Sequence, residues 1–121
     1  MLSRLHIVLS VLYFLAAIAL GNYMGMRQDF RLKHVHVHIA VLGWLSMAVL
    51  GILYRVYPAL EKGWLPRAHL GLHNVGLVTF MSGFTYFAVT GEKVIAPIAG
   101  GAGLLSIGIL LLAIHVVVRL R

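Results

Sequence analysis

Four long apolar runs divide the chain and leave few alternatives for its fold. They extend from Leu5 to about Met24, from about His34 to Tyr57, from about Ala68 to Val89 and from Val94 to about Val118. Each run is long enough to cross a bilayer, which takes about 20 apolar residues in a helix. None alternates polar and apolar residues, which disfavours a membrane barrel. The sequence therefore predicts an all-α membrane protein with four transmembrane helices.

The composition agrees with a membrane location. Charged residues make up only 11% of the 121 residues and hydrophobic residues 61%, whereas a soluble domain has roughly 25% charged residues. The basic residues that give the net charge of +7 lie between the apolar runs. There we expect them to contact lipid headgroups of the bilayer, and we expect no nucleic-acid partner. The absence of cysteine excludes disulfides, thiolate metal sites and haem attached through Cys.

Short connections predict how the four helices are arranged. Residues 27–33, 58–67 and 91–93 join consecutive runs, and Pro66 suits a helix start. Connections of this length predict a single domain, residues 1–121, folded as an up-down-up-down bundle. Small residues let membrane helices approach closely, so the glycines inside the runs mark packing seams within or between subunits. These are Gly43, Gly51, Gly71, Gly76, Gly83, Gly100, Gly101, Gly103 and Gly108.

The basic residues favour an orientation with both termini in the cytoplasm. With the N-terminus inside, six Lys and Arg residues lie on the inner side and four on the outer side. Cytoplasmic loops carry the excess of positive residues in membrane proteins. We therefore expect an N-in, C-in protein of the bacterial inner membrane.

Histidines are the residues most suggestive of function, because the chain has seven and ionisable groups in membrane helices are usually functional. His34 and His38 are four residues apart and share one helical face, where such a pair can clamp a metal ion. At 3.6 residues per turn, His36 is turned about 200° away from each of them. His36 and His38 therefore suit two different sites on opposite sides of one helix.

His69 and His73 form a second pair four residues apart and are further candidate metal ligands. The short connection before them places residue 73 level with about residue 50, so His38 lies roughly 18 Å away along the axis. That distance is too long for His38 and His73 to share one iron. We expect two layers, with His34, His36 and His38 outside and His6, His69, His73 and His115 inside. For His6 and His115, contact with headgroups is an equal alternative.

A family resemblance is carried by the second run. The residues His36-Val37-His38-Ile39-Ala40-Val41-Leu42-Gly43-Trp44, continuing to Pro58, resemble the catalytic subunit of haem-copper oxidases, especially its cbb3-type and nitric-oxide-reductase branches. The segment from His69 to Gly76 is similar to the family's following helix. Together these similarities cover about 40 residues. In that family a His-x-His pair opens a helix, and its two imidazoles bind a low-spin haem b and the active-site haem on opposite faces.

The resemblance also implies an assembly. The family's subunit has twelve helices in three arcs of four, so this chain is similar to one third of it. A homotrimer would bring the three second helices together, and His38 of one subunit and His36 of the next would ligate one haem. The chain departs from the family in lacking a His-His copper pair and a further helix with copper ligands. His34 is left for a second metal, with copper as the candidate.

Three functions stay open. The first is a membrane b-type haem protein for electron transfer or for gas or redox chemistry, an oxidoreductase if it is an enzyme, with an unidentified redox partner. Its candidate cofactor ligands are His34, His36, His38 and His73. The second is a copper or zinc protein of metal handling or oxidase assembly, with His69 as a further ligand. The third is a structural membrane subunit.

Overall fold

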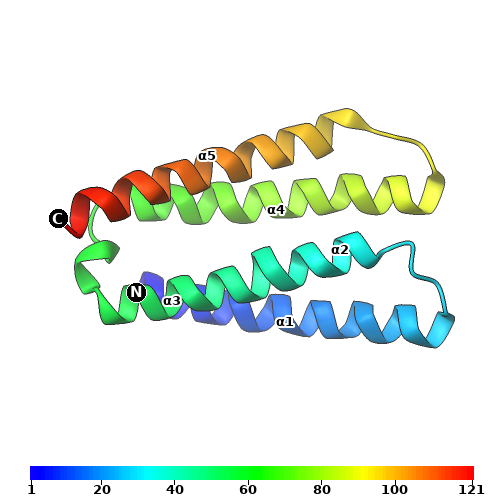
Figure 1. The fold of residues 1–121 in the computed structure, drawn as a ribbon, viewed down its shortest axis with the longest axis horizontal. Helices are drawn as coiled ribbons and strands as arrows, with labels where there is room; N and C mark the ends of the chain where they lie inside the picture. Colours follow the sequence, from blue (N-terminus) through cyan, green and yellow to red (C-terminus); the bar gives the residue numbers. More distant parts are fainter.

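The computed structural model describes all 121 residues, which form helices and no strand. Seven elements follow one another: α1 (Leu2–Arg27), α2 (Lys33–His38), η1 (Ile39–Leu45), α3 (Ser46–Val56), η2 (Pro58–Glu61), α4 (Leu65–Thr90) and α5 (Ile95–Arg119). Because α2, η1 and α3 are continuous, they make one long helix. The four long helices run up and down with both termini at the same end, as predicted (Figure 1).

The helices form two hairpins that lie side by side. α1 packs along the α2–α3 helix, and α4 packs along α5 (Figure 1). Leu70 and Leu112 of the second hairpin pack against a core cluster from the first. The Tyr13 hydroxyl donates to Asn74 Oδ1 at 2.7 Å and adds a polar link between α1 and α4. The two hairpins therefore share one core.

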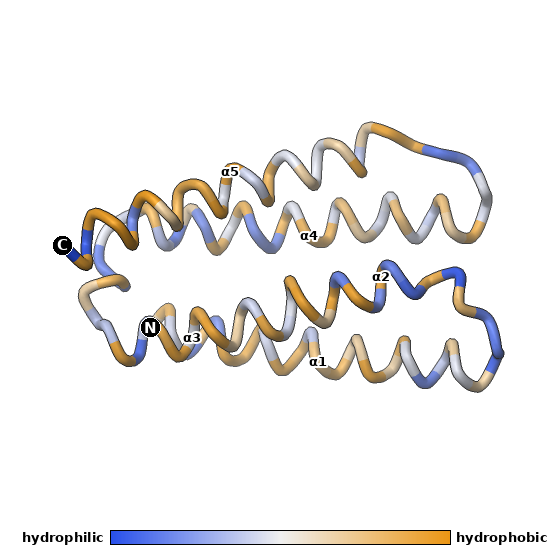
Figure 2. Tube along the Cα trace, viewed as in Figure 1, coloured by the Kyte–Doolittle hydropathy of each residue, from blue (hydrophilic) through white to orange (hydrophobic).

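Three of the long helices have the length and composition of membrane spans: α1, the helix Lys33–Val56, and α5. These confirm three of the four predicted transmembrane helices at the level of length and apolarity. α4 is as long as α1, with 26 residues. Polar residues interrupt it along its length (Figure 2), among them His69, His73 and Asn74. Membrane insertion of α4 remains a prediction.

The second long helix changes its winding near the middle. Ile39–Leu45 is a π-helix, in which hydrogen bonds run to the fifth residue back instead of the fourth. Beside this widened segment, the Leu42 carbonyl accepts a hydrogen bond from His73 Nε2 at 2.9 Å. A side chain of α4 thus bonds the backbone of the neighbouring helix. No proline or charged residue in the apolar run predicts this change of winding.

Glycines lie where helices approach most closely, as expected for six of the nine. A Cβ atom on Gly101 would lie 2.7 Å from the Gly76 carbonyl oxygen, and one on Gly51 would lie 2.7 Å from Ile7 Cδ1. At Gly71, Gly100 and Gly103 a Cβ atom would meet nothing within 4 Å, so these glycines mark no seam within the chain, and a seam between subunits stays a prediction for them. These three glycines lie on open faces of the second hairpin.

At the end that holds both termini, the Glu61 carboxylate of η2 bonds the start of α1. It accepts hydrogen bonds from the Ser3 backbone N–H at 2.6 Å and from the Met1 amine at 2.9 Å. The backbone donor first, and then the amine, lower the pKa of Glu61. The connection between the two hairpins is thereby fixed to the start of α1.

Substitution of Gly101 by Val should open the second hairpin, because the new side chain would collide with the backbone of α4. We expect a loss of about 1–3 kcal/mol in the free energy of unfolding. Titration of the detergent-solubilised protein with sodium dodecyl sulfate, followed by circular dichroism, measures this loss. Gly103→Val is the matched control and should unfold like the wild type. Equal losses in the two variants would contradict the seam.

Acidification should release the Glu61 contact. Because the folded-state pKa is lowered, the carboxylate stabilises the folded chain above its ordinary value of about 4.3, and this stabilisation is lost as pH falls through the folded value. Thermal unfolding between pH 7 and pH 3 measures the effect. Glu61→Gln should be less stable at pH 7 and should depend less on pH, whereas Glu92→Gln should follow the wild type. Parallel curves for wild type and Glu61→Gln would refute this role.

Candidate functional site

The three histidines of α2 lie at the end of the bundle opposite the termini (Figure 1). His36 faces α1, where its Nδ1 donates to the Ala17 carbonyl at 2.9 Å. His38 faces α4, with its ring centroid 5.3 Å from that of Phe80 and 6.2 Å from that of Phe84. The structure thus places His36 and His38 on different sides of one helix, as their spacing predicts.

Backbone carbonyls fix the tautomers of five histidines. A carbonyl oxygen can only accept a hydrogen bond, so the ring nitrogen that bonds it carries the hydrogen. Nδ1 donates to Leu2 O in His6, to Ala17 O in His36 and to His34 O in His38, at 2.7–2.9 Å. Nε2 donates in His73 and in His115. The other nitrogen of each neutral ring then presents a lone pair, which is the form that binds a metal.

His34 is the most exposed of the α2 histidines. Together with Arg31 and Phe84 it lines a hollow of about 260 Å³. The Asp29 carboxylate holds Arg31 there at 2.7 Å, and this hydrogen bond lowers the pKa of Asp29. No three His, Asp or Glu side chains come together around a point where a metal ion would fit. Within one chain, the pair His34 and His38 therefore lacks a third ligand.

The relative depth of the two hairpins differs from the expected one. His73 bonds the Leu42 carbonyl, and Asn74 Nδ2 lies 4.0 Å from Met47 Sδ. Residue 73 is therefore level with residues 42–47, and our register, which placed it level with residue 50, was wrong by one to two turns. The reason is that η2 folds back along the bundle, so α4 begins deeper than α3 ends. His38 and His73 still do not meet, because His38 contacts Phe80 instead.

Four buried side chains from three helices form a row that begins near the end holding the termini. We call it the buried row: Tyr54, His6, His69 and His73. Each is 2% exposed or less. Ring centroids are 5.0 Å apart for Tyr54 and His6, 6.3 Å for His6 and His69, and 5.2 Å for His69 and His73. The sequence shows His69 and His73 as a pair. The predicted inner layer also contained His6, whose ring the structure places beside that of His69, whereas Tyr54 was not among the predicted site residues.

The buried row contains five polar atoms without a hydrogen-bond partner. They are the Tyr54 hydroxyl, His6 Nε2, His73 Nδ1 and both ring nitrogens of His69. An unpaired buried donor or acceptor costs about 1–3 kcal/mol, so native structures rarely keep one without a water or ligand. Five such atoms on adjacent rings indicate a place that water or a ligand occupies.

His115 belongs to neither group of histidines. It is 2% exposed, and its Nε2 donates to the Leu60 carbonyl at 2.9 Å, which ties α5 to the η2 turn. His6 is fully buried as well. The alternative in which His6 and His115 contact lipid headgroups is therefore wrong, because His6 packs against Tyr54 and His69, and His115 packs against the η2 turn.

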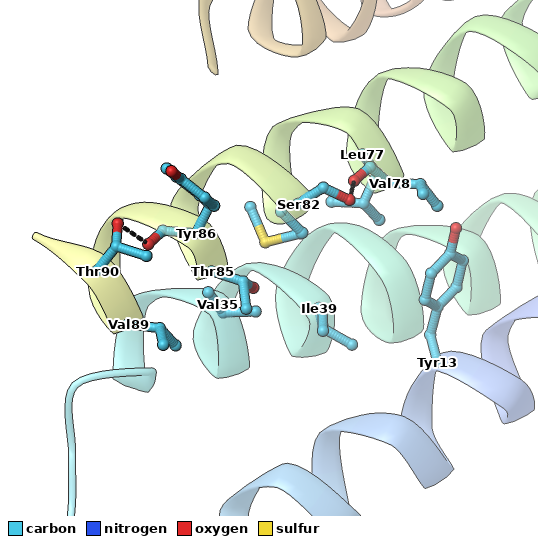
Figure 3. A pocket seen from close by; sticks show the side chains of 11 residues that line it. Tyr13, Val35, Ile39, Leu77, Val78, Ser82, Thr85, Tyr86, Val89 and Thr90 are labelled. Carbon is cyan, nitrogen blue, oxygen red and sulfur yellow. Dashed lines mark hydrogen bonds between the residues drawn. The ribbon is translucent and has the colours of Figure 1, made fainter. Parts of the chain in front are cut away.

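The hollows of the chain leave no space for a haem beside a histidine. The hollow in Figure 3 measures about 600 Å³ and lies between Val35, Ile39 and Tyr13 of the first hairpin and residues 77–90 of α4, with no histidine among its lining residues. A hollow beside His69 and His73 measures about 370 Å³. This volume is near the lower limit of the range of ligand pockets, about 300–1,000 Å³, whereas haem is a large ligand, so a haem would have to lie at the surface of the bundle.

Comparisons with known proteins give no relative. No protein-family model, no curated protein and no solved structure matches the chain. The resemblance to haem-copper oxidases thus stays a prediction from the residues of the second helix, and the candidate site has to be judged by its own geometry.

Proposed function

We propose that the chain is a membrane protein that binds b-type haem through His36 and His38 and carries electrons. The observation that supports this function is the fixed tautomer of both rings. Each Nδ1 is held by a backbone carbonyl, so each Nε2 offers its lone pair, and the two rings lie on different sides of α2. Neutral imidazoles oriented in this way are the usual axial ligands of haem.

The surroundings of the two rings suit a haem at the surface of the bundle. Phe80 and Phe84 beside His38 provide an apolar wall, which excludes water and influences the reduction potential. The Ala17 and His34 carbonyls make the rings better electron donors by accepting the Nδ1 hydrogen. Bound haem would supply one-electron chemistry. Two axial imidazoles favour electron transfer or redox sensing, and an open axial position would allow a gas to bind.

A second copy of the chain has to complete such a site. His36 and His38 point to different sides of α2, and the hollows beside histidines in one chain are too small for haem. We propose a homotrimer in which His38 of one subunit and His36 of the next bind the same haem. Closed symmetry is the usual form of homo-oligomers. The open faces at Gly71, Gly100 and Gly103 are available for contacts between subunits.

Absorbance of the purified protein tests the haem directly. Protein from haem-replete cells should show a Soret band and the split α and β bands of low-spin haem after reduction. His36→Ala and His38→Ala should each abolish these bands, while His34→Ala should keep them. A colourless protein that carries copper or zinc would instead favour the metal-handling alternative, and a colourless protein without metal would favour a structural subunit.

Co-expression of two variants tests whether the site is shared. If each haem lies between His38 of one subunit and His36 of another, His36→Ala and His38→Ala can complement each other in mixed assemblies. In every mixed trimer one of the three ordered pairings has both ligands, so we expect about one third of the wild-type haem in assemblies that contain both variants. Differently tagged subunits, purified through both tags, give the measurement. No recovery of haem would contradict ligation between subunits.

A further inference from the structure

The buried row connects to water at the end that holds the termini. A hollow of about 550 Å³ opens there and is lined by Ser3, Arg4, Tyr54, Arg55, Glu61 and their neighbours. Tyr54 forms part of its wall while its ring contacts that of His6. The row then continues inward through His69 to His73, which reaches the level of Leu42. Polar groups therefore extend from an aqueous opening to the middle of the bundle.

The unpaired atoms follow one another along this row and do not surround one point. No three ligating side chains converge anywhere in the chain, and adjacent ring centroids are 5.0–6.3 Å apart. Hydrogen bonds of about 2.7–3.2 Å join a bridging water to each of two polar groups, so single waters can connect neighbouring rings where side-chain motion opens their contacts. Bridging waters would satisfy all five unpaired atoms at once. A row of rings and waters is the arrangement that conducts protons.

His69 differs from its neighbours in having both ring nitrogens unpaired. His6 and His73 each have one nitrogen committed to a backbone carbonyl, so each offers only an acceptor to the row. A proton that arrives at one nitrogen of His69 gives an imidazolium, and release of the proton from the other nitrogen restores a neutral ring in the opposite tautomer. His69 is therefore the one ring in the row that can pass a proton from one side to the other.

We propose that Tyr54, His6, His69 and His73 form a water-filled proton path from the end near Glu61 to the middle of the bundle, with His69 passing the proton. This function is independent of the proposed haem site, because the haem ligands proposed above, His36 and His38, are not part of the row. Glu61 and Tyr54 both line the hollow at the entrance, and the row carries protons inward from there. Ionisable rows inside membrane helices are a common form of proton relay.

Proton exchange at the histidine rings tests the path in the full chain. The protein is labelled with ¹⁵N-histidine, placed in lipid nanodiscs, and examined by water-edited solid-state NMR. The ring protons of His69 should exchange with water about tenfold faster, or more, than those of His115, which is equally buried but bonded to Leu60. Exchange at His69 as slow as at His115 would overturn the proposal, as would a bound metal ion on its ring nitrogens.

Two substitutions test the order of the row. Tyr54→Phe removes one unpaired hydroxyl and should fold normally, and we expect exchange at His69 to slow about tenfold. His69→Leu should stop exchange at His73 and leave exchange at His6 unchanged, because His6 is nearer to the entrance. Unchanged exchange at His73 would mean that water reaches it by another route, such as the apolar hollow beside Leu45 and Val49, and would refute the proposed path.

Discussion

The structure depends on how imidazole rings find hydrogen-bond partners among apolar helices. Backbone carbonyls are the available acceptors, and five of the seven rings donate a hydrogen bond to one. Each such bond fixes a tautomer. Two of them also join separate elements: the bond to Leu42 joins α4 to the second long helix, and the bond to Leu60 joins α5 to η2. Packing, ring orientation and the chemistry available to each histidine are therefore settled together by the same set of bonds.

Most of the secondary structure could be predicted from the sequence, because apolar runs of helical length have few other folds. The opposite orientation of His36 and His38 followed from helical periodicity alone. The depth of α4 could not be predicted, since it depends on how η2 folds back along the bundle. The π-helix in Ile39–Leu45 has no marker in the sequence either. The common layer of His6, His69 and His73 could be predicted, but the contact of Tyr54 with His6 could not, because it depends on how α3 packs against α1.

The two groups of histidines differ in what surrounds them. The α2 histidines lie near the surface, where a second copy of the chain can reach them, and they suit a ligand shared between subunits. The buried row lies within one chain, and hollows adjoin it at Tyr54, near the termini, and at His69 and His73. One small fold thus separates the proposed shared site from a row of groups that lies within one chain. According to the two proposals, electrons would pass at the end that carries the α2 histidines, and protons would enter at the end that holds the termini.

The π-helix affects the directions in which the α2 histidines point. Each residue of a helix turns the chain by about 100°, so the widened segment resets the rotation of α2 relative to α3. The segment before it, α2, carries His36 and His38, and the segment after it, α3, packs Tyr54 into the core. A deletion of one residue within Ile39–Leu45 would therefore swing His36 and His38 to new neighbours while every side chain stayed the same. The direction of the ligands is encoded in chain length as much as in residue identity.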